Sequence, residues 1–182
     1  MLPQSHAFVA LGLQKYLADR YPELKDADYR AVALAAMLPD LIDKPVAIFL
    51  LPQTKAGLLF AHAPVFHLPL WFIARARRGF LPYVIAFTGH IIFDRIWFFH
   101  DTFWFPLRGF RFHQWKHIGD PKAFSAAYKD LFSRRPYLFL YELFALFVLI
   151  QFIVSAGLTN RRALWHFIRT GRILEHQNGH SP

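Results

Sequence analysis

The chain has 182 residues, room for one domain of ordinary size, and 55% of them are hydrophobic, including 21 Phe, which excludes a disordered chain. It contains no Cys, so disulfides and thiolate ligands are excluded, and any bound metal ion must be held by nitrogen and oxygen. The net charge of +9 suits anionic lipid headgroups or nucleic acid phosphates, and lipid is favoured because the basic residues flank apolar runs.

The first half of the chain is predicted to form helices separated by turns. Ser5 is a suitable N-cap for a first helix, which Tyr21-Pro22 ends. A second helix is expected to stop at Leu38-Pro39-Asp40, because proline disrupts helical hydrogen bonding. In chain order, we expect helices at about residues 6–19, 29–37 and 80–99, with a further apolar stretch over 58–74.

The second half begins with a basic, aromatic segment over residues 106–121, which is expected to form an irregular loop. Pro121 can start a helix that ends near Ser133, and Asn160 begins a basic amphipathic helix. No alternation of period two is long enough for a strand, so the predicted fold class is all-α, a helical bundle with a hydrophobic helix near its C-terminus.

That hydrophobic helix is predicted over Tyr137–Leu158, 22 residues with Glu142 as their one charge. About 20 apolar residues cross the hydrocarbon core of a bilayer, so we interpret this segment as a transmembrane helix. Arg pairs stand on both sides of it, and they therefore indicate no orientation. The alternative is a buried central helix, in which Glu142 would need a partner.

His and Asp residues stand at helical spacings inside the apolar runs. His90 and Asp94 are four residues apart, so they share one face of a helix and can reach one ion. Burying unpaired carboxylates costs several kcal/mol each, roughly, so metal ligation explains the set better than a plain core does. The candidate ligands are His6, Asp40, His62, His67, His90, Asp94 and His100, with Asp43 one turn after Asp40. Nitrogen and oxygen ligands suit Zn²⁺, Mn²⁺ or Fe²⁺.

These motifs resemble a known family. His6, Leu38-Pro39-Asp40, a central His and Gly89-His90-x3-Asp94 are similar to the membrane-bound metal-dependent hydrolases. That family is related to the zinc-dependent phospholipase C and nuclease superfamily, whose His-x3-Asp-x5-His signature matches His90, Asp94 and His100 by spacing. The resemblance implies a helical, metal-binding hydrolase-like domain over residues 1–120. Residues 121–182 would then supply the membrane helix, the amphipathic helix and a polar tail, and the location would be the bacterial cytoplasmic membrane.

The function implied is hydrolysis of a phosphoester by metal-activated water, with a phospholipid or a lipid-linked phosphate as the substrate. Asp94 would bridge metal ions, and Asp40 or Asp43 would accept a proton from the attacking water. The substrate anion would be held by basic residues, namely Arg95, or Arg108 and Lys116 of the loop.

Four alternatives remain open at the level of sequence. One is a non-catalytic membrane protein in which the same ligands only brace helices or bind an ion structurally. His100-Asp101 matches the His-Asp pair of soluble nucleotide phosphohydrolases, though a two-residue motif is weak. His62-x4-His67 and His113-x3-His117 resemble the histidine boxes of membrane di-iron oxygenases, but the expected His-x2-His-His box is missing. Nucleic acid binding by the aromatic, basic loop over residues 108–117 is disfavoured, because the same composition describes a membrane-interface belt.

Overall fold

The computed structural model describes residues 2–114 and 121–174, and for a few residues at the start of α6 it describes only the backbone. Within these ranges the protein is all-helical, with no strand, as the sequence predicts. A π-helical turn over Val46–Leu50 follows α2, and short 3₁₀ turns join most of the other elements, above all between residues 52 and 66. The α-helices are α1 (Pro3–Arg20), α2 (Tyr29–Pro45), α3 (His67–Ala76), α4 (Leu81–Phe93), α5 (His100–Phe103), α6 (Pro121–Arg134), α7 (Leu138–Ser155) and α8 (Arg161–Thr170).

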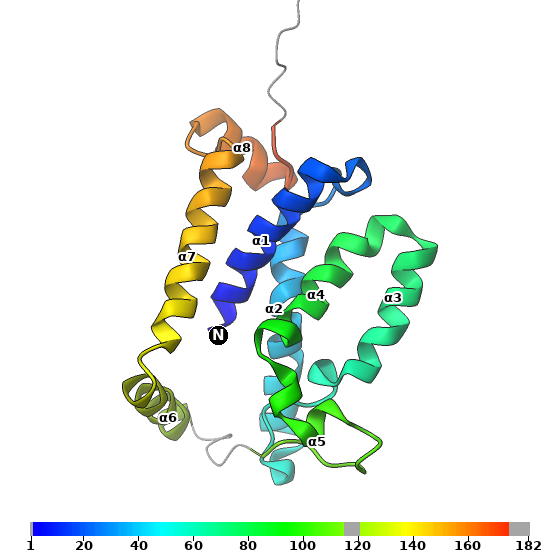
Figure 1. Ribbon diagram of the computed structural model, residues 1–182, viewed down its shortest axis with the longest axis vertical. Coiled ribbons are helices and arrows are strands. Elements are labelled where there is room, and N and C mark those ends of the chain that lie inside the picture. The colour runs from blue at the N-terminus through cyan, green and yellow to red at the C-terminus, as the bar shows by residue number, and fades with distance from the viewer. Residues whose placement is uncertain (1, 115–120, 175–182) are drawn as a thin grey trace, which may run out of the picture.

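The centre of the fold is a close packing of α1, α2 and α4. α1 packs against both α2 and α7, while α4 packs against α2 on one side and α3 on the other (Figure 1). The residues at the centre are small, with Ala10 of α1, Ala35 and Ala36 of α2 and Ala86 of α4 in one buried cluster. Small side chains let helix backbones approach closely, and this brings the start of α1 and the ends of α2 and α4 together.

α2 does not stop where the sequence predicts. The expected break at Leu38-Pro39-Asp40 is wrong, because the helix continues through Pro39 to Pro45. A proline in a helix interior removes the hydrogen bond to the carbonyl four residues earlier and loosens that turn. Here the turns before the proline are held by the buried side chains of Val32 and Ala36, so tertiary packing offsets the local loss.

The predicted helix over residues 80–99 is also wrong after residue 93. α4 ends at Phe93 with Asp94 as the C-cap, and Arg95 then adopts a left-handed backbone conformation, φ 52°. A 3₁₀ turn over Ile96–Phe98 follows, before α5 starts at His100. This turn separates Asp94 from His100 by a change of chain direction that helical periodicity cannot reveal.

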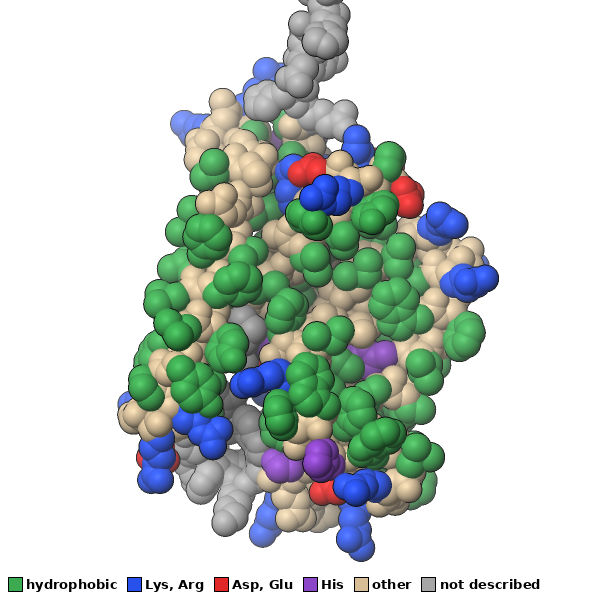
Figure 2. Space-filling view, in the orientation of Figure 1, with side chains coloured by type: hydrophobic (Ala, Val, Ile, Leu, Met, Phe, Trp, Pro, Cys, Tyr) green, Lys and Arg blue, Asp and Glu red, His purple; other side chains and the backbone are tan. Residues whose placement is uncertain are grey.

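α7 is 18 residues long and apolar enough to cross a membrane. Its buried residues are Ala145 and Phe152, while most of its other large hydrophobic side chains are exposed. Glu142, its one charged residue, accepts a hydrogen bond from the backbone N–H of Leu2 at 3.0 Å and another from the hydroxyl of Ser5. Hydrophobic side chains also cover much of the middle of the face in Figure 2, interrupted there by a basic side chain and by histidine, while most Lys and Arg lie toward its upper and lower ends.

The last helices lie at opposite ends of α7 (Figure 1). α6 begins at Pro121, as the sequence predicts, and precedes α7. α8 begins after Asn160, whose side chain accepts hydrogen bonds from the backbone N–H groups of Arg162 and Ala163, and Gly171 ends it in the left-handed region. These caps confirm that the predicted helix begins after Asn160, and they place its end before Gly171.

Candidate metal centre

His62 is held by the carboxylate of Asp43. Nδ1 of His62 lies 2.7 Å from Oδ2 of Asp43. The same carboxylate accepts hydrogen bonds from three backbone N–H groups of the irregular segment before α3: Leu59 at 2.7 Å, Ala61 at 3.0 Å and His62 itself at 3.1 Å. An ionised carboxylate only accepts, so Nδ1 of His62 carries the proton and Nε2 presents a lone pair.

His90 is oriented by the backbone of α2. Its Nδ1 lies 2.7 Å from the carbonyl oxygen of Ala36, which only accepts hydrogen bonds, so the proton is on Nδ1. Nε2 of His90 therefore presents a lone pair, as Nε2 of His62 does. Pro39 has no N–H, so the carbonyl of Ala35 has no helical hydrogen-bond donor, and this turn of α2 is loosened. Ala36 is the next residue in the same turn. The proline therefore stands at the turn of α2 that receives a side chain from α4.

The Nε2 atoms of His62 and His90 face each other at 3.2 Å, and both rings are buried. Two lone pairs at this distance repel unless a cation lies between or beside them. A carboxylate–histidine or carbonyl–histidine pair is the usual outer shell of a metal site. Two nitrogen ligands of one tetrahedral zinc ion, at about 2.0–2.1 Å each, are about 3.3 Å apart, which agrees with the observed separation.

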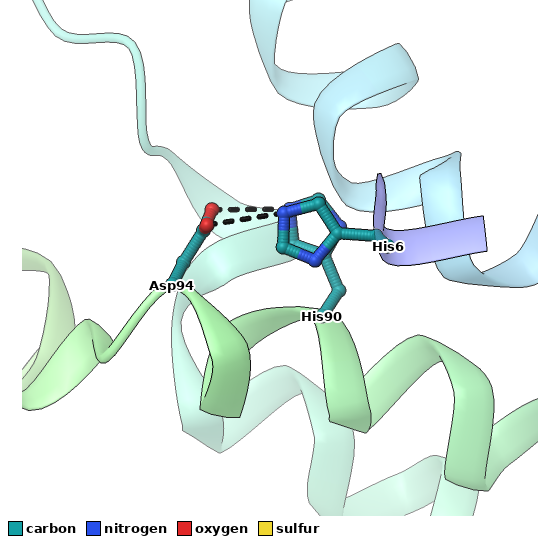
Figure 3. Close-up of side chains that lie close together, drawn as sticks. All are labelled: His6, His90 and Asp94. Atoms are coloured by element: carbon teal, nitrogen blue, oxygen red, sulfur yellow. Dashed lines mark ion pairs between the residues drawn. The ribbon is translucent and has the colours of Figure 1, made fainter. Parts of the chain in front are cut away.

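His6 and Asp94 extend this centre. The ring of His6 stacks on that of His90 with centroids 3.9 Å apart, and its Nε2 lies 3.1 Å from Oδ1 of Asp94 (Figure 3). Oδ2 of Asp94 lies 3.4 Å from Nε2 of His90. Both ring nitrogens of His6 are buried, and within the described part of the chain neither makes a hydrogen bond of normal geometry. An unsatisfied buried imidazole of this kind fits a metal ligand.

The charges at the centre follow from these contacts. Burial lowers the pKa of His6 by more than the neighbouring Asp94 carboxylate raises it, so His6 is neutral at pH 7. Burial acts to raise the pKa of Asp94, but the contacts with His6 and His90 outweigh it and hold that pKa far below its usual range. A neutral imidazole and an ionised carboxylate are the states in which these groups bind a metal ion.

Asp40 completes the set from α2. Its Oδ1 lies 3.7 Å from Nε2 of His62 and 3.9 Å from Nε2 of His90. Its Oδ2 turns away and pairs with Nζ of Lys44 at 2.7 Å. The ligand atoms thus form two groups that share His90: His6, His90 and Asp94, and Asp40, His62 and His90. The arrangement offers nitrogen and oxygen donors for one or two divalent cations.

The structure brings five of the predicted ligands together and leaves others apart. His67 is buried, but Nδ1 lies 3.2 Å from the hydroxyl of Thr88 and Nε2 lies 3.0 Å from the carbonyl of Ala61. His100 is exposed at the start of α5 and belongs to neither ligand group. Asp43, predicted to act on water, instead uses both of its carboxylate oxygens to hold His62 and the segment before α3.

The predicted substrate-binding residues lie outside the ligand set. Arg95 is exposed, and its guanidinium lies 5.6 Å from the ring centroid of Phe98 and 5.5 Å from that of Tyr141 in α7. Arg108 is exposed in the loop after α5. Lys116 lies outside the described residues. Sequence reasoning missed Lys44, whose spacing of four residues from Asp40 on a helix was the available signal.

Comparison with known proteins found no matching family model, no similar curated protein and no similar solved structure. The resemblance to membrane-bound hydrolases therefore rests on the sequence motifs alone.

Proposed function

We propose that the protein is a membrane-associated, metal-dependent hydrolase of phosphoesters, acting on a phospholipid or a lipid-linked phosphate. The observation that carries the proposal is the pair of Nε2 atoms 3.2 Å apart, each with its proton held on the opposite nitrogen by an outer partner. Two carboxylates beside the pair supply the negative charge that a divalent cation requires. The exposed apolar surface of α7 supports a membrane location, which we assign to the bacterial cytoplasmic membrane.

Zn²⁺ suits the donor set best, because imidazole nitrogens and carboxylate oxygens are common zinc ligands, and Mn²⁺ or Fe²⁺ would accept the same donors. The ligands would be His6, Asp40, His62, His90 and Asp94. A divalent cation held by them would supply a lowered pKa for water and positive charge to neutralise phosphoryl oxygens.

The two carboxylates, Asp94 and Asp40, have different roles. Both oxygens of Asp94 face histidine nitrogens, at 3.1 Å for His6 and 3.4 Å for His90, so Asp94 serves as a ligand. Asp40 has one oxygen toward the histidines and the other toward Lys44, which makes it the carboxylate available for proton transfer. In the reaction, a water oxygen bonds to phosphorus while Asp40 accepts the water proton. The P–O bond to the alcohol breaks, and Asp40 returns the proton to the leaving oxygen.

Elemental analysis of protein purified in detergent tests this proposal first. We expect stoichiometric zinc, manganese or iron, together with hydrolysis of p-nitrophenyl phosphate or bis-p-nitrophenyl phosphate. His90→Ala and Asp94→Ala should each lose the metal and the activity. His100→Ala is the matched control, because His100 is exposed and belongs to neither ligand group, and it should keep both. Wild-type protein that holds no metal after purification and metal addition would refute the proposal.

A structural metal site is the second candidate. His6, His62 and His90 are almost completely buried, and they join α1, the segment before α3, and α4, as a bracing ion would. In that case the metal content and the loss of stability on chelation would match the first proposal, but no phosphoester would be turned over.

A further inference from the structure

A cleft of about 170 Å³ reaches the metal centre from the side on which α6 and α7 lie. One side of the cleft is polar, formed by Asp40, Asp94 and Lys44. The opposite side is apolar and includes Phe132 of α6 together with Leu138 and Tyr141 of the first turn of α7. The cleft therefore combines a charged surface next to the candidate ligands with a hydrocarbon-like surface next to the membrane helix.

Lys44 is the one cation among the described residues that line this cleft. Its ammonium group lies 2.7 Å from Oδ2 of Asp40, and its side chain is 25% exposed. An ammonium has three N–H donors, so Lys44 can pair with Asp40 and still donate to an anion in the cleft. Because Asp40 lies between Lys44 and the imidazole nitrogens, a phosphoryl oxygen bound by Lys44 would be close to the metal centre.

The position of the cleft along α7 sets its depth in a membrane. Leu138 and Tyr141 belong to the first turn of the apolar helix, and the exposed Arg134 and Arg135 lie three to four residues before its start. Arg side chains at the end of a membrane helix lie at the level of the lipid headgroups. The cleft then opens at the depth where lipid phosphates of that leaflet lie.

The size of the cleft limits what enters it. Pockets that enclose a whole drug-sized ligand have volumes of about 300–1,000 Å³, which is more than this cleft offers. A headgroup phosphate fits together with the hydrocarbon next to it, while the rest of the lipid stays outside the cleft, in the bilayer. Contact with hydrocarbon also explains why the wall opposite the ligands is apolar rather than charged.

We propose that this cleft is the substrate site for a phosphoester lipid that remains in the bilayer leaflet. Lys44 binds a phosphoryl oxygen, and Phe132, Leu138 and Tyr141 contact the hydrocarbon next to the headgroup. This inference rests on the proposed function, which it extends by assigning an anion-binding residue and a route of entry from the membrane.

The test compares lipid and water-soluble substrates on metal-loaded protein in mixed micelles. The pairs are dioleoyl phosphatidic acid with glycerol 3-phosphate, and dioleoyl phosphatidylcholine with glycerophosphocholine. Lys44→Met should raise KM about tenfold for both members of the hydrolysed pair, with metal content unchanged, because a charge-assisted hydrogen bond is lost. Lys44→Arg should restore the wild-type KM.

Leu138→Asn tests the route of entry. It should raise KM for the lipid substrate only, whereas the control Leu140→Asn, in the same turn of α7 but not lining the cleft, should change neither KM. An unchanged KM in Lys44→Met, or loss of metal from it, would overturn the role of Lys44. Equal effects of Leu138→Asn and Leu140→Asn would overturn the route.

Binding of a non-hydrolysable phosphonate analogue of phosphatidic acid separates the two proposals. If Leu138→Asn and Lys44→Met weaken this binding while no phosphoester is hydrolysed, the cleft assignment stands and the proposed function fails. If soluble phosphoesters are hydrolysed and neither variant changes binding, the proposed function stands and the cleft assignment fails.

Discussion

Replacing Asp43 by Asn tests whether this buried carboxylate orients His62 for metal binding. Asp43 accepts four hydrogen bonds, three from backbone N–H groups and one from Nδ1 of His62. An amide oxygen in the place of Oδ2 would keep three of them, but the amide NH₂ would then face the N–H of Ala61. The unsatisfied donor costs about 1–3 kcal/mol, and each bond that changes from charged to neutral costs roughly 1 kcal/mol.

Asn is neutral, so it avoids the cost of burying a charge, and this offsets part of the loss. We therefore expect the free energy of unfolding to fall by about 3–5 kcal/mol. Metal affinity should also fall, by about 10–100-fold, because His62 loses the partner that fixes its tautomer and ring orientation. Thermal unfolding in detergent, followed by Trp fluorescence, measures the first effect. Competition with a chromogenic chelator measures the second.

Asp130→Asn is the matched control, because Asp130 is an exposed residue of α6 that pairs with Arg134 at 2.8 Å. Exposed ion pairs contribute about 0–1 kcal/mol, so this variant should behave as wild type in both assays. Equal stability and equal metal affinity in Asp43→Asn and Asp130→Asn would refute the assignment of Asp43 as an outer partner of the metal centre.

Three further outcomes are expected. Gly12→Ala places a Cβ 2.2 Å from Cγ1 of Val148, so it should cost about 1–3 kcal/mol in unfolding free energy, and Val148→Ala in the same chain should restore stability. Glu142→Ala removes the acceptor of the Ser5 hydroxyl, and it should lower both the melting temperature and the metal affinity, because the first turn of α1 also carries a ligand. Burial lowers the pKa of His67 by more than its hydrogen bond to a backbone carbonyl raises it. Below pH 6.5 the unfolded chain therefore binds the proton more readily, and urea unfolding at pH 7 and pH 5 should show a smaller loss of stability in His67→Gln than in wild type.

Helical periodicity located much of the architecture because it depends on neighbouring residues alone. The all-α class, the start of α6 at Pro121, the cap at Asn160 and the apolar helix α7 all follow from such local patterns. The predicted helix boundaries are wrong where contacts with residues far away in the sequence determine the backbone. Pro39 lies inside a helix because the turns around it are packed against other helices, and Arg95 ends a predicted helix by a turn that the local sequence does not signal.

Residue types alone determined the chemistry that this protein can hold. A chain with no Cys, and with His and Asp set into apolar runs, offers imidazole and carboxylate groups as its main metal ligands. Which of these groups meet is a property of the tertiary structure, since spacing fixes only neighbours on one helix, such as His90 and Asp94. His67 and Asp43 show the limit, because both are buried and polar, yet one binds a backbone carbonyl and the other holds His62. The packing of α1, α2, α4 and the segment before α3 decides which lone pairs face one another.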